Sequence, residues 1–451
     1  ALDRGIELTA ARPLLGLSVH LLHRMCAWDA WRGAWERMAR EIDVATDLGS
    51  PFSLLSEATT PQQQLSYTKR WAAARFAKTQ EAPRAPAPGS GARRLRVGYF
   101  SSDFQEHAAA YLLAEVLELH DRSRLEVFAY SYGPDDGSPM RARIRTAVEH
   151  FVDIAWEADD AAVKRIRADE LDVLVDLKGY TVGDRLKLMA QRPAAVQVAW
   201  LGYPGTTGAD FIDYLIADDF IVPHGAEAHY SEKVVRMPHC YQPNDRKRPV
   251  VAPLTRAEYG LPEEGFVFCC FSQAVKITPE IFARWMRLLQ SVPGSVLWLA
   301  EDNRWASENL KRTAAALDVA AERIVFGARV AFAQHLARFR VADLALDTFP
   351  YTSHTIASDG LWMGCPLVGL CGDTFAARVS GSILASCGLQ DLVTTNLDDY
   401  ENLARRFATD GAFMRGVKAR LAAARDIAPL FDARQFARDL EALYLRMARA
   451  G

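Results

Sequence analysis

The chain has 451 residues, of which 50% are hydrophobic and 24% are charged, and its formal net charge is -3 at pH 7. This length is enough for two or three domains with large cores. The near-neutral charge excludes the basic field typical of nucleic-acid-binding proteins, and no apolar run is long enough for a membrane span. We therefore expect no nucleic-acid partner and no membrane partner.

Residues 1–80 are predicted to form a helical segment, because apolar residues recur with a helical period through most of it. We expect about four packed helices. His20, His23 and Cys26 recur every three residues and would share one helix face. A metal could use such a face, but packing explains the spacing more simply, and we expect no metal there. Residues 81–94 are rich in Pro, Ala and Gly without periodicity, which predicts a linker.

Short apolar runs alternate with helical patterns over the rest of the chain. Residues 95–248 contain the runs LRVGYFS, LEVFAYSY, LDVLVDL, VQVAWLGY and DYLIADD, and residues 249–430 contain FVFCCFS, SVLWLA, RIVFG, ADLALDTF, PLVGL and DLVTT. This alternation predicts parallel sheets with helices on both faces. We therefore predict an α/β fold with two Rossmann-like, doubly wound lobes over these ranges and a C-terminal helix over residues 431–451. Ligands of such sheets bind beyond the carboxyl ends of the strands, and the cleft between two lobes is the expected site.

The seven cysteines show no pattern of a disulfide framework. Their number is odd, no CxxC occurs and most have apolar neighbours, as in FVFCCF. Free thiols buried in a reducing compartment explain this usage best, so we expect a cytoplasmic protein. Neither GxGxxG nor GxxxxGK followed by Ser or Thr occurs. The sequence therefore supports neither a dinucleotide fingerprint nor a Walker loop.

Polar residues at the predicted strand ends are the candidates for chemistry. In the first lobe, His107 follows a strand where a helix begins, and Pro204 and Gly205 lie in the loop LGYPGTTG after another strand. The three glycines of that loop allow unusual backbone angles and close approach of a ligand. An exposed loop histidine and a tight turn are the ordinary structural explanations of these two features.

The second lobe contains further polar strand ends. Gln273 and Lys276 lie between a strand and a helix, where a lysine could face a phosphate, although a solvated surface lysine is the ordinary alternative. His335 and Arg338 are three residues apart and share one face of a predicted amphipathic helix. The loop after the strand that ends at Asp176, with Lys178, Tyr180 and Thr181, and the loop of residues 346–368 bring the polar strand ends to six. Six such loops, in both lobes, indicate a binding site more strongly than any single loop does.

The stretch LDTFPYTSHTIASDGLWMGCPLV, residues 346–368, predicts a strand, a loop, a helix and a strand. Its helix begins among hydroxyl side chains, with His354 and Thr355 at the start and Asp359 one turn later. A helix start leaves backbone N–H groups unpaired and favours negative charge, and hydroxyl donors make it suitable for a phosphate. An ordinary N-cap uses the same residue types, so this stretch alone leaves both explanations open.

At these residues the chain closely resembles a known family, the protein O-linked N-acetylglucosamine transferases in their bacterial form. The segments that carry the resemblance are LRVGYFSSDFQEH, LKGYT, RPAAVQVAWLGYPGTTGADFIDY, YSEKVVRMPH, PGSVLWL, DTFPYTSHTIASDGLWMGCP and GDTFAARVSGSIL, and it extends from about residue 20 to the C-terminus. The resemblance implies a GT-B fold, in which two Rossmann-like lobes follow an array of tetratricopeptide repeats. No 34-residue repeat occurs in residues 1–80. This segment is therefore expected to be tetratricopeptide-like, similar to the last, irregular helices of such an array.

The resemblance assigns five residues to the phosphates and the acceptor. His107 matches the histidine beside the sugar and the acceptor hydroxyl. Lys276 matches the lysine that binds the diphosphate, and Gln273 matches a nearby phosphate contact. His354 and Thr355 match the phosphate-binding helix start. His107 and Lys276 are therefore the expected catalytic residues.

The resemblance assigns another group to the rest of the donor. His335 matches the histidine stacked on uracil, and Arg338 matches the arginine near the same base. Asp359 matches a ribose contact. Pro204 and Gly205 belong to the motif WLGYPGT, and we include them among the donor-binding residues.

The chain departs from the animal members of this family at three positions. Ile356 replaces a second threonine and removes a hydroxyl donor, Tyr351 replaces a small cysteine near the sugar pocket, and Phe332 replaces a lysine near the ribose. The insert that animal members carry between the lobes is missing. These differences bear on the donor sugar more than on the fold or the nucleotide site.

The resemblance implies an inverting glycosyltransferase that moves N-acetylglucosamine from UDP-N-acetylglucosamine to Ser or Thr hydroxyls of proteins. A lysine and a helix start can stabilise the leaving diphosphate without a metal. No aspartate pair has an obvious metal arrangement, since Asp218 and Asp219 are as easily a strand-end cap, and we expect no metal and no cofactor. The alternatives are transfer of glucose from UDP-glucose to Asn or of fucose from GDP-fucose to Ser or Thr, a nucleotide-sugar epimerase, and an inactive helical-repeat scaffold.

Overall fold

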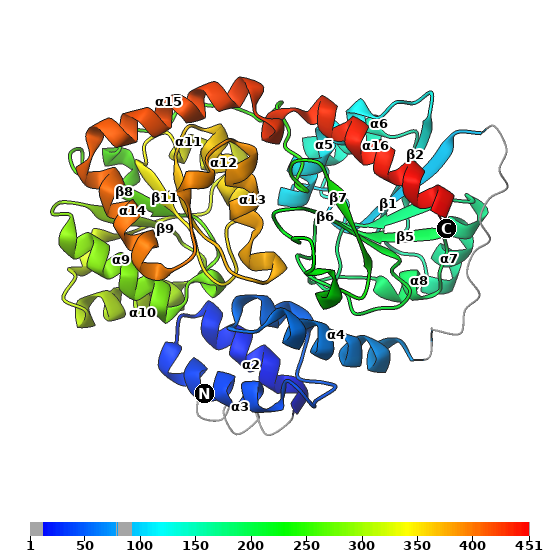
Figure 1. The fold of residues 1–451 in the computed structure, drawn as a ribbon, viewed down its shortest axis with the longest axis horizontal. Helices are drawn as coiled ribbons and strands as arrows, with labels where there is room; N and C mark the ends of the chain where they lie inside the picture. The colour runs from blue at the N-terminus through cyan, green and yellow to red at the C-terminus, as the bar shows by residue number, and fades with distance from the viewer. Residues whose placement is uncertain (1–11, 78, 80–92, 451) are drawn as a thin grey trace. The chain divides into compact units, whose positions relative to one another are not determined.

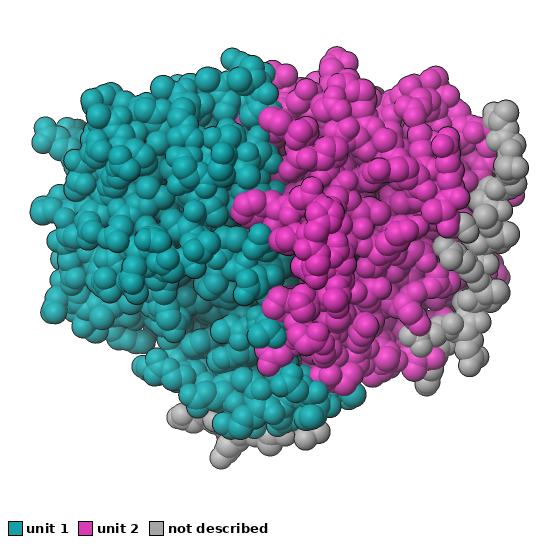
Figure 2. All heavy atoms as spheres, viewed as in Figure 1, with its two compact units in different colours: residues 1–60, 248–428 teal, residues 61–247, 429–451 magenta. Residues whose placement is uncertain are grey.

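The computed structural model describes residues 12–77, 79 and 93–450, and the chain divides into two compact units (Figure 2). Unit 1 combines residues 1–60 with 248–428, and unit 2 combines residues 61–247 with 429–451. The predicted linker over residues 81–94 lies outside the described residues, except at its last two positions. No helix within the described ranges is long and apolar enough to cross a membrane.

Unit 2 is built on a seven-stranded parallel sheet, ordered β3-β2-β1-β4-β5-β6-β7 (Figure 1). Its strands are β1 Leu95–Ser101, β2 Leu125–Ser131, β3 His150–Asp153, β4 Val173–Asp176, β5 Val196–Ala199, β6 Tyr214–Asp218 and β7 Lys233–Met237. The five predicted apolar runs correspond to β1, β2, β4, β5 and β6. Every residue of β4, β5 and β6 is buried, as expected for central strands of a parallel sheet covered on both faces.

The two edge strands, β3 and β7, were not predicted from the sequence. His150 and Asp153 at the ends of β3 are exposed, and so is Lys233 at the start of β7. An edge strand has one unpaired side and commonly carries charged residues there. Its sequence therefore contains no continuous apolar run, and this is why the prediction missed both strands.

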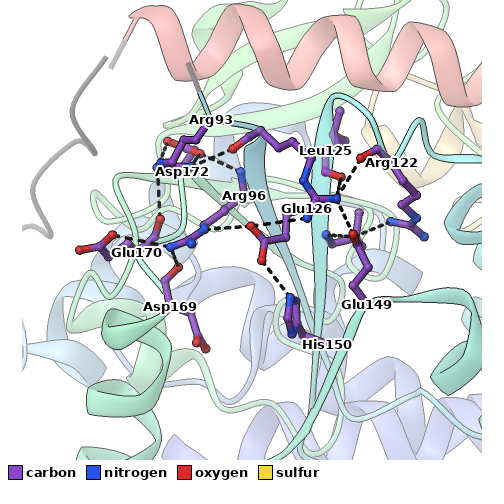
Figure 3. Close-up of polar contacts among 12 residues, drawn as sticks. Arg93, Arg96, Arg122, Leu125, Glu126, Glu149, His150, Asp169, Glu170 and Asp172 are labelled. Atoms are coloured by element: carbon purple, nitrogen blue, oxygen red, sulfur yellow. Dashed lines mark hydrogen bonds and ion pairs between the residues drawn. The ribbon is translucent and has the colours of Figure 1, made fainter. Parts of the chain in front are cut away.

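Charged side chains hold the amino ends of the strands in unit 2 (Figure 3). Arg96 Nε donates to Glu126 Oε2 at 3.1 Å, and His150 Nε2 lies 2.9 Å from Glu126 Oε1. Arg93 forms a bidentate pair with Asp172, whose carboxylate also accepts the backbone N–H of Arg96. These contacts join neighbouring strands at the edge opposite to their carboxyl ends, so we assign them a structural role.

The helices of unit 2 are α4 Pro61–Phe76, α5 Ala108–Leu119, α6 Pro139–Ala147, α7 Asp159–Ala168, α8 Leu186–Ala190 and α16 Ala433–Ala450. A buried polar network anchors α16, the last helix of the chain, to the sheet. Tyr444 OH donates to Tyr99 OH at 3.1 Å, and Tyr99 OH lies 2.7 Å from His120 Nε2. The other ring nitrogen of His120 lies 3.1 Å from Glu441 Oε1. These bonds help to explain why residues 429–451 belong to unit 2.

Unit 1 contains a six-stranded parallel sheet, ordered β10-β9-β8-β11-β12-β13. Its strands are β8 Val267–Cys270, β9 Val296–Ala300, β10 Ile324–Gly327, β11 Leu344–Leu346, β12 Leu367–Leu370 and β13 Val393–Thr394. Its helices after the sheet begins are α9 Pro279–Ser291, α10 Arg304–Ala316, α11 Phe332–Arg338, α12 Thr355–Trp362, α13 Val379–Ser386, α14 Leu397–Thr409 and α15 Gly411–Ile427. All six predicted runs of this lobe correspond to strands.

The N-terminal helices divide between the two units. Helices α2 Arg12–Arg24 and α3 Trp28–Glu41 and the 3-10 helix η1 Pro51–Ser56 belong to unit 1, whereas α4 belongs to unit 2. Trp28 packs on Phe282 of α9, with ring centres 5.4 Å apart. Asn309 Nδ2 of α10 donates to the carbonyl oxygen of Met25 at 2.8 Å. The first helices are thus part of the core of unit 1.

The helix face expected for His20, His23 and Cys26 does not form. Helix α2 ends at Arg24, and Cys26 has a φ of 49°, so the expectation that the three residues share one helix is wrong. Cys26 Sγ donates to the carbonyl oxygen of Ala274 at 3.8 Å. His23 is buried, and its Nδ1 lies 2.9 Å from a carboxylate oxygen of Glu57. These side chains therefore pack within unit 1.

Both sheets have a topological switch point. In unit 2, β1 lies between β2 and β4, so successive strands are added on opposite sides of it. In unit 1, β8 lies between β9 and β11 in the same way. Ligands of doubly wound sheets bind outside the carboxyl ends of the strands at such points. The loops after β1 and β4, and those after β8 and β11, are therefore where binding residues are expected.

Candidate functional site

Lys276 lies in the 3-10 turn η4, Ala274–Lys276, which follows β8 as predicted. Its Nζ donates to the carbonyl oxygen of Thr352 at 2.9 Å and lies 3.6 Å from the ring centre of Tyr351. No described carboxylate forms an ion pair with it. Burial lowers the pKa of Lys276 to about 7, although the charge of Asp347 opposes this shift. A cation without an anionic partner is suited to receive an anionic ligand.

Asp347 organises the loop that supports this lysine. The carboxylate is fully buried directly after β11, and Oδ1 accepts the backbone N–H groups of Thr348 at 2.9 Å and Ser353 at 2.7 Å. Oδ2 accepts the hydroxyl of Ser380. Burial raises the pKa of Asp347 to about 6. These bonds fold the loop after β11 so that it contacts Lys276.

Helix α12 begins without a side-chain cap from any described residue. The hydroxyls that could cap it have other partners: Ser353 Oγ lies 3.1 Å from Ser272 Oγ, and Thr352 Oγ1 donates to the carbonyl oxygen of Ala376 at 2.7 Å. The Thr355 hydroxyl makes no hydrogen bond to another described residue. The ordinary N-cap is thus not formed. The first backbone N–H groups and the Thr355 hydroxyl can instead receive a phosphate.

Two further predicted phosphate contacts flank this helix start. His354 occupies the N-cap position, with Nε2 3.4 Å from the carbonyl oxygen of Ala376 and its ring centre 5.0 Å from that of Tyr351. Burial, with a contribution from Lys276, lowers the pKa of His354 well below its usual value, so the ring is neutral at pH 7. Gln273 is exposed, and its side chain has no hydrogen-bond partner among the described residues.

Asp359 lies in the second turn of α12 and is buried. Its Oδ1 accepts from Arg248 Nη1 at 2.6 Å, whereas Oδ2 has no partner within the described part of the chain. The Arg248 guanidinium also lies 5.8 Å from the ring centre of Trp362 on the same helix. Burial raises the pKa of Asp359 to about 6 despite Arg248. The ion pair orients the carboxylate and leaves one oxygen for a hydroxyl donor.

His335 and Arg338 lie on α11, the predicted helix. The His335 ring makes edge contacts with Phe271 and Phe339, with ring centres 5.7 and 5.5 Å apart. Burial lowers the pKa of His335 to about 4. His335 Nε2 and Arg338 Nε are buried and have no hydrogen-bond partner among the described residues. The half-buried ring of His335 is the part of this cluster that a planar heterocycle could contact.

His107 caps helix α5 in unit 2. Its Nδ1 accepts the backbone N–H of Ala109 at 3.2 Å. Because a backbone N–H can only donate, Nδ1 must carry a lone pair, and a neutral imidazole then carries its proton on Nε2. The free nitrogen of His107 is therefore arranged as a hydrogen-bond donor.

A buried ion pair adjoins His107 at the switch point between β1 and β4. Lys178 Nζ lies 2.8 and 2.9 Å from the two carboxylate oxygens of Asp103, and Asp103 Oδ2 lies 3.6 Å from His107 Nδ1. Lys178 and Asp103 are 7% and 6% exposed. The sequence indicated Lys178 only as a polar residue of a strand-end loop, and it did not indicate Asp103. A lone Lys or Asp after a strand is common, and their pairing across 75 residues has no local signal.

Pro204 and Gly205 lie in the loop after β5 and are buried. The backbone of this loop packs tightly on the loop after β4, since a Cβ added at Gly202 would lie 1.9 Å from the carbonyl oxygen of Leu177. Glycine is thus required at Gly202 by lack of space. The carboxylate of Glu232, another residue missed by the prediction, bonds to the same loop.

The structure brings together the predicted residues of each unit at the carboxyl ends of its strands. In unit 1, the loops after β8 and β11 bring Lys276 to the loop that leads into α12. His335 and Arg338 lie on α11, the helix that follows β10. In unit 2, His107 and the loop of Pro204 and Gly205 follow β1 and β5. The described residues contain no group of three or more His, Cys, Asp or Glu side chains that could hold a metal ion.

Comparison with known proteins supports the resemblance. The family model described as Glycosyl transferase family 41 matches residues 83–251 and 242–440. SEC of Arabidopsis thaliana, a probable UDP-N-acetylglucosamine–peptide N-acetylglucosaminyltransferase, is 34% identical over 450 residues, covering 95% of this chain and 46% of that protein. The UDP-N-acetylglucosamine–peptide N-acetylglucosaminyltransferase of Caenorhabditis elegans is 28% identical, covering 79% of this chain and 41% of that protein. The chain thus spans about half the length of the curated relatives it matches.

Solved structures agree with the predicted fold. A mutant of the O-GlcNAc transferase of Thermobaculum terrenum matches with a TM-score of 0.83 and 30% identity, covering 97% of this chain and 82% of that chain. A glycosyltransferase of Rickettsia africae, only 10% identical, matches with a TM-score of 0.51 over 80% of this chain and 100% of that chain, which is a likeness of fold alone. The predicted GT-B fold, with two parallel-sheet Rossmann-like lobes preceded by helices, is confirmed.

Proposed function

The chain belongs to glycosyl transferase family 41, and we propose that it is an inverting transferase that moves N-acetylglucosamine from UDP-N-acetylglucosamine to Ser or Thr hydroxyls of proteins. The observation that carries this proposal is the unpaired ammonium of Lys276 beside the uncapped start of α12, at the switch point of unit 1. The names of the Arabidopsis and Caenorhabditis relatives support the choice of donor and acceptor.

The proposed reaction exchanges one bond at the anomeric carbon. The acceptor hydroxyl oxygen bonds to this carbon while the bond to the diphosphate oxygen breaks, and the bonding electron pair leaves with UDP. Negative charge therefore grows on the diphosphate in the transition state. We assign Lys276, the first N–H groups of α12 and the Thr355 hydroxyl to stabilise this charge, because fixed donors aimed at developing charge are effective catalysts. Gln273 and His354 are the assigned neighbouring contacts.

Other residues are assigned to holding the reactants. His107 donates from Nε2 to an oxygen of the sugar or the acceptor. In this tautomer Nε2 has no lone pair, so the hydroxyl proton passes to another base. His335 and Arg338 are assigned to uracil, Asp359 to the ribose, and the loop of Pro204 and Gly205 to the sugar.

We also propose that the protein works in the cytoplasm. All seven cysteines are free and six of them are buried. Free thiols are typical of a reducing compartment, where disulfides are rare.

A panel of nucleotide sugars tests the proposed function. Purified protein is incubated with UDP-N-acetylglucosamine, UDP-glucose and GDP-fucose, each with and without acceptor protein, and glycosylated residues are mapped by mass spectrometry. We expect turnover of UDP-N-acetylglucosamine that depends on acceptor and modifies Ser or Thr, with inverted anomeric configuration by NMR. Epimerisation of the donor without acceptor, preference for another donor, or no turnover at all would each contradict the proposal.

A further inference from the structure

Glu232 is a buried carboxylate without a cationic partner. It directly precedes β7 in unit 2 and is 4% exposed. No Lys, Arg or His in the described part of the chain forms an ion pair with it. Removing a carboxylate from water is costly unless hydrogen-bond donors replace the lost solvent. The donors that surround Glu232 therefore indicate what this residue holds in place.

All of its side-chain partners among the described residues come from one loop, residues 201–208, which follows β5. Oε2 accepts the hydroxyl of Thr206 at 2.7 Å. Oε1 accepts the backbone N–H of Thr207 at 2.6 Å and also the hydroxyl of Thr207. Both threonines are buried. The two carboxylate oxygens thus bind two successive residues and connect this loop to the segment before β7.

The same loop is restrained on two other sides. A Cβ added at Gly202 would lie 1.9 Å from the carbonyl oxygen of Leu177, and one added at Gly208 would lie 2.5 Å from the backbone nitrogen of Lys69 in α4. The loop after β4 and helix α4 therefore touch its backbone directly. Glu232 supplies the polar restraint between these two contacts, where Pro204 and Gly205 lie.

We propose that Glu232 is a positioning residue for the sugar of the donor. It holds Pro204 and Gly205 at the carboxyl end of β5, where the proposed function assigns the sugar, and this inference rests on that proposed function. Apolar packing alone could be enough to keep the loop of residues 201–208 folded. A charged acceptor with one oxygen for each threonine fixes both the direction and the spacing of the loop.

The variant Glu232→Gln tests this inference. It keeps the size of the side chain but replaces one acceptor oxygen by an NH₂ donor that faces another donor. We expect kcat/KM for the UDP-sugar to fall roughly 10- to 100-fold, as for loss of a hydrogen bond to a charged group, and UDP affinity to change less than about twofold. The residues assigned to uridine and phosphate all belong to unit 1, whereas Glu232 and its loop belong to unit 2, so we expect a smaller effect on UDP alone. Thr207→Val removes the hydroxyl donor but keeps a side chain of similar size, and it should also lower kcat/KM for the UDP-sugar.

Glu441→Gln is the matched control. Glu441 is another buried carboxylate of unit 2, and it accepts the backbone N–H of Asp121 at 2.9 Å, away from the loop. This variant should lower the melting temperature without changing kcat/KM. Affinities for UDP and UDP-N-acetylglucosamine are measured by calorimetry for every variant, and Thr207→Val decides the question if Glu232→Gln does not fold.

Two results would overturn the inference. The first is a lower melting temperature with wild-type kcat/KM in both Glu232→Gln and Thr207→Val, which would mean that Glu232 is purely structural. Equal losses of UDP and UDP-sugar affinity would remove its link to the sugar. A failure of the proposed function appears already in the wild-type panel, whereas a failure of this inference appears only in the variants.

Discussion

Lys276 forms no ion pair with any carboxylate of the described residues, although the charge of Asp347 acts on it. Its ammonium contacts a carbonyl oxygen and an aromatic ring, both from the loop that enters the switch point after β11. A directly paired carboxylate would compete with an anionic ligand, and here none has to be displaced, although burial lowers the pKa of Lys276 to about 7. The sequence indicated the lysine from its place between a strand and a helix, but its partners Tyr351 and Thr352 are about 75 residues away and had no local signal.

We expect Lys276→Ala to lower transfer roughly 100- to 1,000-fold, the usual effect of removing one donor from developing negative charge. The protein should remain folded, because the side chain is only half-buried. Steady-state transfer and a thermal melt are measured on the same preparation. Wild-type turnover with an intact melt would show that Lys276 does not act on the leaving group.

The pKa of Lys276 adds a pH signature to this prediction. With a pKa of about 7, the free lysine is mostly neutral at pH 8. A bound diphosphate favours the charged form and raises this pKa, so UDP binding should take up a proton at pH 8. Calorimetry in two buffers of different ionisation enthalpy measures this uptake, and Lys276→Met should abolish it. Equal uptake in the variant would assign the proton elsewhere.

His335 serves as a test of the uracil assignment. The side chain is half-buried, so part of the ring is open to a ligand, whereas its Nε2 is covered and has no described partner. We expect His335→Ala to weaken UDP binding by a larger factor than it weakens folding. Titration calorimetry with UDP is compared with the melting curve. Unchanged UDP affinity together with a large fall in melting temperature would mean that His335 is a core residue.

Among the helices, α12 is one whose first residues the sequence could not assign to a single role. The residue types at its start fit a cap or a phosphate site equally well. The cap is absent because Thr352 and Ser353 bond to Ala376 and Ser272, which lie on other segments. Whether a side chain caps α12 therefore depends on residues of other segments, which only folding brings near.

Helices α2 and α3 are predicted to unfold together with the rest of unit 1. Trp28 of α3 is buried against Phe282 of α9, so Trp28→Ala should destabilise unit 1 by roughly 3–5 kcal/mol. Because UDP stabilises the state that binds it, the destabilised transition should be the one that UDP shifts to higher temperature. Calorimetric melts with and without UDP check this. A separate early transition, with the UDP-dependent one unchanged, would show that α2 and α3 form an independent module.

In each of the two α/β units, the assigned residues lie at the carboxyl edge of a parallel sheet. Lys276 and the start of α12 are assigned to the charge of the leaving group, so we propose that transfer needs no metal. We expect transfer to be unchanged in excess EDTA. Rates are compared before chelation, after chelation and after Mg²⁺ or Mn²⁺ is restored. Activity that disappears with EDTA and returns with either ion would refute metal independence.

The sequence alone predicted the α/β class, the two series of strands and the helices between them. Buried parallel strands are apolar along their whole length, and surface helices are apolar on one face only. Both therefore leave recognisable patterns in the sequence. It also placed Lys276, His354 and Thr355 at strand or helix ends, where such patterns stop and polar residues begin.

The folded structure was needed to find the edge strands β3 and β7 and the supporting residues Asp103, Asp347 and Glu232. It was also needed to see that no described side chain caps α12. Edge strands face solvent and need no apolar run. Each supporting carboxylate bonds to residues far away in the chain. Such contacts leave no periodic pattern and no fixed spacing in the sequence. They exist only because the strand order brings separate loops to the same edge of a sheet.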